Sequence, residues 1–105
     1  MTDTCVVLVT APTPEKAAEI ARAVVEEKLA ACGNIVPGIR SIYQWEGKIC
    51  EDAEALLILK VPAKRVQELS DRIVALHPYD LPEVVALRIE GGNEKYIDWI
   101  VQSMY

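Results

Sequence analysis

The sequence lacks the features that mark several large classes of protein. No segment approaches the ~20 consecutive apolar residues of a membrane-spanning helix, and the apolar run after the N-terminus extends only from Cys5 to Val9. We therefore predict no membrane partner. Residues 1–4 carry no basic side chain, so we also expect no signal peptide and a cytoplasmic location.

Basic residues are too few for a nucleic-acid-binding surface. The chain has 11 Lys and Arg residues against 16 Asp and Glu, a formal net charge of −5, and no basic stripe. Because binding to nucleic acid requires clustered positive charge against the phosphates, we predict no nucleic-acid partner. An acidic chain instead attracts cations.

Motifs of common enzymes and of structural zinc sites are absent as well. The chain has no P-loop, no GxSxG, no HExxH and no dinucleotide fingerprint, so we predict that it is not an enzyme. Its three cysteines, Cys5, Cys32 and Cys50, are widely spaced and include no CxxC pair. This pattern indicates reduced thiols and argues against a structural zinc site.

Hydrophobic residues make up 51% of the 105 residues, enough for a single domain over residues 1–105. Their periodicity first predicts a strand at 5–10 that is buried on both faces and a helix that begins after Thr13 and ends at Gly33. Two strands follow at 34–46 and 48–61, joined by a turn at Glu46–Gly47. The chain continues with a helix at 62–77, a strand at 84–90 and a last helix capped by Asn93. We therefore expect an α+β protein with the ferredoxin-like order βαββαβ plus a C-terminal helix.

The two central strands predict a hairpin longer than a monomer needs. Each arm is about twice the ~5–6 residues of an average strand, and Pro37-Gly38 indicates a bend or bulge in the first arm. The protruding ends would expose ladder groups beside Ile42, Tyr43 and Trp45. We predict that copies of the chain pair here; a hairpin that curls back onto its own domain is the alternative.

The only histidine, His77, lies directly before Pro78. Because a helix ends at or before the residue preceding a proline, we expect His77 at a helix C-terminus, followed by a turn that carries Tyr79, Asp80 and Glu83. An imidazole beside carboxylates suggests a metal-coordinating or pH-sensing site. A histidine that packs and forms hydrogen bonds at the helix end is the alternative, and acid–base chemistry with Glu83 is a remote one.

Two further sets of residues are candidates for metal binding. Cys32 offers a thiolate, which is a soft ligand for copper, while a packed cysteine is the alternative. Asp52 and Glu54 share one face of the second long strand, whereas Glu51 faces the other way. This pair would attract a hard cation, or would simply form a solvated edge.

Aromatic and basic side chains suggest a separate ligand cleft. Tyr43 and Trp45 share one strand face, Arg40 and Lys48 nearby would suit an anion, and Tyr79 adds a third ring. Packing between subunits, where aromatic residues are enriched, is the alternative.

Several motifs occur together in a characteristic order. Residues 28–43 read KLAACGNIVPGIRSIY, and WEGK at 45–48, HPY at 77–79 and PE at 82–83 follow. Together they closely resemble the CutA divalent-cation tolerance family. The resemblance implies a ferredoxin-like fold, a tight trimer formed through the hairpin strands, a PII-like architecture and a role in divalent-cation tolerance without firmly attached enzymatic activity. Copper binding is proposed for some members.

The chain departs from the pattern of the members proposed to bind copper. Those members can carry a cysteine and a second histidine where this chain has Val9 and Leu76. We therefore predict a homotrimer with no obligatory cofactor, which binds Cu(II) or another divalent cation weakly through His77, Asp80, Glu83 and Cys32. The alternative is a PII-like signalling or scaffold module that binds a small ligand or partner protein between subunits, at Arg40, Tyr43, Trp45, Lys48 and Tyr79.

Overall fold

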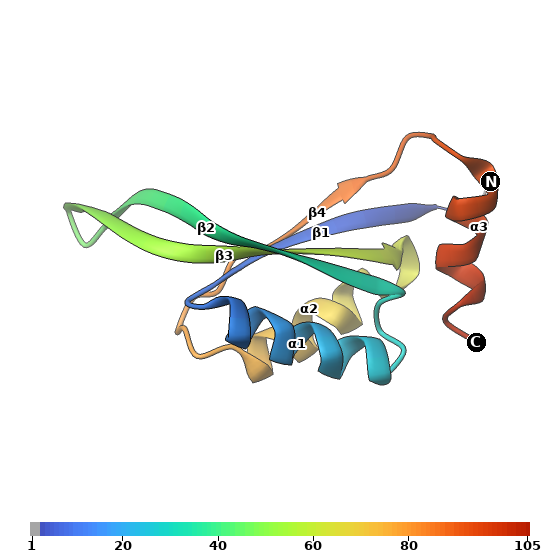
Figure 1. Cartoon of the computed structure of the whole chain (residues 1–105), viewed down its shortest axis with the longest axis horizontal. Helices are drawn as coiled ribbons and strands as arrows, with labels where there is room; N and C mark the ends of the chain where they lie inside the picture. Colours follow the sequence, from blue (N-terminus) through green and yellow to red (C-terminus); the bar gives the residue numbers. More distant parts are fainter. Residues whose placement is uncertain (1–2) are drawn as a thin grey trace.

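A four-stranded antiparallel sheet organises residues 3–105, the part of the chain that the computed structural model describes. The elements in chain order are β1 (Thr4–Ala11), α1 (Pro14–Glu26), β2 (Cys32–Trp45), β3 (Lys48–Pro62), the 3₁₀ turn η1 (Ala63–Arg65), α2 (Val66–Leu76), β4 (Val84–Arg88) and α3 (Glu94–Gln102) (Figure 1). The strands lie in the order β2-β3-β1-β4. This arrangement confirms the predicted α+β class.

Helices α1 and α2 lie side by side on one face of the sheet, and α3 lies at the end where β1 begins (Figure 1). The core fills the space between the sheet and the two helices, and its largest fully buried side chains include Ile20, Leu57, Leu59, Leu69 and Ile73. The prediction that the first strand is buried on both faces is wrong. Val6 and Leu8 are only partly buried, because α1 and α2 cover the opposite face of the sheet (Figure 1).

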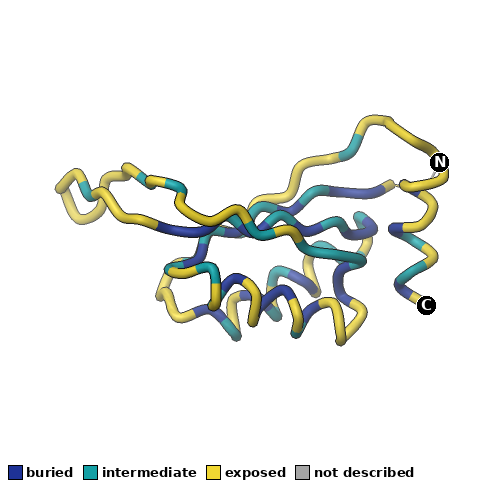
Figure 2. The backbone as a smooth tube through the Cα atoms, in the orientation of Figure 1, coloured by how far each residue is buried: buried dark blue, intermediate teal, exposed yellow. Residues whose placement is uncertain are grey.

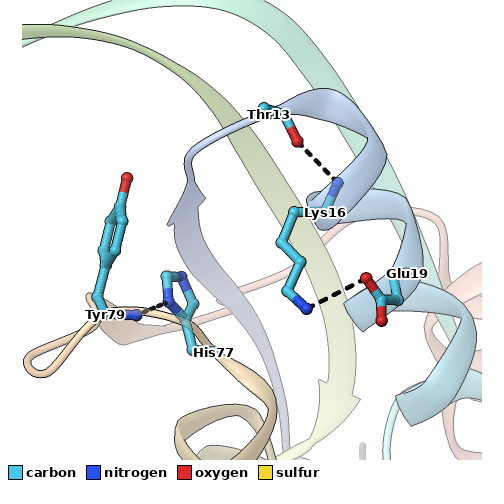
Figure 3. Close-up of polar contacts among 5 residues, drawn as sticks. All are labelled: Thr13, Lys16, Glu19, His77 and Tyr79. Atoms are coloured by element: carbon cyan, nitrogen blue, oxygen red, sulfur yellow. Dashed lines mark hydrogen bonds and ion pairs between the residues drawn. The ribbon is translucent and has the colours of Figure 1, made fainter.

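Helix α1 begins as predicted but ends earlier. The Oγ1 of Thr13 accepts a hydrogen bond of 3.0 Å from the N–H of Lys16 (Figure 3), as expected of an N-cap. The helix ends at Glu26, and Lys28 takes a positive φ of 58°. Cys32, predicted at the end of this helix, is therefore the first residue of β2. The predicted stop at Gly33 is wrong.

The hairpin of β2 and β3 is as long as predicted. The strands have 14 and 15 residues, and the register shifts between Val36 and Ile39, which confirms the bulge expected around Pro37. Glu46 and Gly47 both have positive φ, 51° and 77°, as a type I′ turn requires. The hairpin extends well past the helices (Figure 1), and the longest dimension of the molecule is 44 Å.

The remaining elements follow their capping signals. The predicted helix at 62–77 begins as η1 and continues as α2, and it ends at Leu76, with His77 in an extended conformation before the proline. Asn93 caps α3 by accepting a hydrogen bond of 3.1 Å from the N–H of Lys95. No helix within residues 3–105 has the length and apolar character needed to cross a membrane.

Candidate functional site

A cleft of about 680 Å³ lies between the hairpin and the turn that joins α2 to β4. Strands β2 and β3 contribute one wall, and residues 78–83 contribute the other. Its lining includes four carboxylates and three aromatic rings: Asp52, Glu54, Asp80, Glu83, Tyr43, Trp45 and Tyr79. The structure thus brings together two predicted ligands, Asp80 and Glu83, with the three predicted rings.

Two phenol–carboxylate hydrogen bonds organise the cleft. Tyr79 donates from its Oη to Oε2 of Glu54 over 2.7 Å, which ties the turn to β3. Tyr43 donates in the same way to Asp52, across the hairpin. Glu54 is buried, with 9% of its surface exposed, so the bond from Tyr79 supplies a donor to a carboxylate that water reaches poorly.

The same hydrogen bonds keep both phenols protonated. The bond to Asp52, followed by desolvation, raises the pKa of Tyr43 to about 12. Burial, followed by the bond to Glu54, raises the pKa of Tyr79 well above its ordinary value. At neutral pH both tyrosines are therefore hydrogen-bond donors.

His77 is buried behind the cleft and both of its ring nitrogens are hydrogen bonded. Nε2 lies 2.7 Å from the carbonyl oxygen of Thr10, and the N–H of Tyr79 lies 3.1 Å from Nδ1 (Figure 3). Because the carbonyl only accepts and the N–H only donates, Nε2 carries the proton and Nδ1 accepts. His77 therefore fastens the turn to β1 and, as placed, has no free lone pair for a metal ion. This geometry matches the alternative interpretation, in which His77 packs and forms hydrogen bonds at the end of the helix.

The predicted metal set is not assembled within one chain. Cys32 lies near α3, where its Sγ is 3.6 Å from the Oη of Tyr96, and it does not line the cleft. Within residues 3–105, no three or more His, Cys, Asp and Glu side chains are grouped so as to hold a metal ion. Within one chain, Cys32 therefore lies apart from Asp80 and Glu83, and metal binding through His77, Asp80, Glu83 and Cys32 stays a prediction.

The predicted basic residues also lie outside the cleft. Arg40 forms an ion pair with Glu51, with 3.0 Å between Nε and Oε2. Lys48 is paired in register with Trp45 beside the turn and does not line the cleft. Within one chain, the three predicted rings therefore line this cleft without the two cations, and the predicted ligand site between subunits stays a prediction.

Glu54 is the residue whose role the sequence pattern described least well. We expected Asp52 and Glu54 either to attract a hard cation or to form a solvated edge, but Glu54 is buried against Tyr79. Alternation along β3 does place Asp52 and Glu54 on the cleft side, as expected.

Comparisons with known proteins define the class to which this α+β chain with its long hairpin belongs. Residues 5–103 match the family described as "CutA1 divalent ion tolerance protein". The chain is 54% identical over 98 residues to the "Divalent-cation tolerance protein CutA" of Thermus thermophilus, covering 93% of this chain and 95% of that protein. It is 50% identical over 98 residues to the chloroplastic protein CutA of Arabidopsis thaliana, with 93% of this chain covered, but spans only 54% of that longer relative.

Solved structures agree with the sequence comparisons. The crystal structure of CutA1 from Oryza sativa matches with a TM-score of 0.94 at 49% identity, covering 97% of this chain and 94% of that one. The solved structure of the divalent cation tolerance protein from Thermus thermophilus matches with a TM-score of 0.90 at 52% identity, covering 92% and 94%. The chain belongs to the CutA1 divalent ion tolerance family.

Proposed function

We propose that the chain acts in tolerance of divalent cations as a non-catalytic cytoplasmic protein, and that the cleft binds a divalent cation such as Cu(II) weakly. The charge of the cleft is the observation that carries this proposal. Four carboxylates line it, and no Lys, Arg or His is among its lining residues in the described part of the chain. A concave surface of one sign of charge concentrates the opposite ion.

Weak affinity follows from the state of these carboxylates. Asp52 and Glu54 already accept hydrogen bonds from phenols, which leaves Asp80 and Glu83 as the more available oxygen ligands. Cu(II) prefers imidazole nitrogen, and a site with few oxygen donors binds it with modest strength. An anion site at Arg40 and Lys48 finds less support, since neither residue lines the cleft.

We further propose a homotrimer of ferredoxin-like protomers. The sheet face opposite the helices carries exposed Val36, Val85 and Leu87, and the protruding hairpin is exposed along most of its length (Figure 2). A monomer would leave this apolar face and the hairpin edges in water, which soluble proteins avoid. Light scattering at micromolar concentration would measure three times the protomer mass of 11.6 kDa; a mass of one protomer contradicts the proposal.

Equilibrium dialysis with Cu(II) tests the cation site. The cleft variant carries Asp80→Asn and Glu83→Gln, and a control with the same change of charge carries Glu15→Gln and Glu26→Gln on α1, outside the cleft. We expect saturable binding to the native protein, weaker binding to the cleft variant and native binding to the control. Equal loss in both variants, or no saturable binding at all, would contradict the proposal.

Tolerance itself is tested in cells. A host strain that lacks its own protein of this family would be grown in graded Cu(II) with the native chain, the cleft variant or the control. We expect the native chain and the control to restore growth and the cleft variant to restore less. Equal growth with all three would show that tolerance of Cu(II) does not depend on Asp80 and Glu83 in the cleft.

A further inference from the structure

We draw no further inference here: the strongest candidate, the half-exposed aromatic pair of Tyr96 and Trp99 on the outer face of α3, with ring centroids 5.5 Å apart, is an unpartnered apolar patch, and nothing in the described part of the structure shows what covers it.

Discussion

The hydrogen bond between Tyr79 and Glu54 allows a change in the free energy of unfolding to be predicted for a single substitution. Tyr79→Phe removes only the hydroxyl group, which donates to the carboxylate over 2.7 Å. Glu54 is 9% exposed, and a buried acceptor that loses its donor costs about 1–3 kcal/mol. Because Tyr79 is itself 37% exposed, water partly replaces the lost donor. We therefore expect the free energy of unfolding to fall by about 1–2 kcal/mol.

A double-mutant cycle isolates this contact. Urea unfolding would be measured for Tyr79→Phe, Glu54→Leu and the double variant, all at one protein concentration because the stability of an oligomer depends on concentration. We expect a coupling free energy of about 1–2 kcal/mol between the two positions. Tyr43→Phe is the matched control, since it removes the same group from an exposed pair with Asp52 and is expected to cost less.

Two outcomes would refute this reasoning. A coupling free energy close to zero would show that the bond between Tyr79 and Glu54 contributes nothing beyond what water provides. An equal loss of stability in Tyr43→Phe and Tyr79→Phe would show that burial of the carboxylate is not what makes the bond strong.

Three further predictions concern other parts of the molecule. Gly33→Ala places a Cβ within 3.1 Å of two side chains and is expected to reduce the free energy of unfolding by about 1–3 kcal/mol; Gly91→Ala, in open space, is the control. The hydrogen bond from Lys64 lowers the pKa of Tyr105, whereas the other three tyrosines have raised pKa values, so Tyr105→Phe should remove the earliest step of the tyrosinate absorbance titration. His77→Ala leaves two backbone groups unpaired and should destabilise the protein by about 1–3 kcal/mol for each group in urea, without abolishing Cu(II) binding in dialysis.

Signals confined to a few neighbouring residues predicted much of the fold. The turn at Glu46–Gly47, the N-caps Thr13 and Asn93 and the helix end before Pro78 all lie where the sequence indicates. Each depends on the backbone preference or hydrogen-bonding capacity of one or two residues, so the surrounding fold has little power to change it.

The end of α1 could not be predicted in this way. Leu29 continues the apolar spacing of the helix, and both Leu29 and Ala30 are buried, yet they follow the last helical residue, Glu26. Burial alone does not require a helix, because a loop that folds back against the core also buries its side chains. Periodicity therefore predicted which residues enter the core better than it predicted their secondary structure.

The candidate site depended on contacts between distant residues. His77 bonds to Thr10, which is 67 positions away, and Glu54 bonds to Tyr79, which is 25 positions away. An imidazole or carboxylate can serve as a metal ligand or as a buried hydrogen-bonding group, and only the partner that the fold supplies decides between them. Spacing within residues 77–83 was therefore insufficient to assign the role of His77.

The wrong expectation about β1 bears on the assembly of the protein. Val6 and Leu8 are apolar, but they lie on the sheet face that α1 and α2 leave uncovered, near Val85 and Leu87 of β4. A strand that is apolar on both faces is typical of a sheet covered on both sides. The sequence thus matches a sheet with a second covering layer, and the single chain supplies only the first. A second copy of the chain against this face would provide the missing layer, which is why we place the homotrimer contact there as well as on the hairpin.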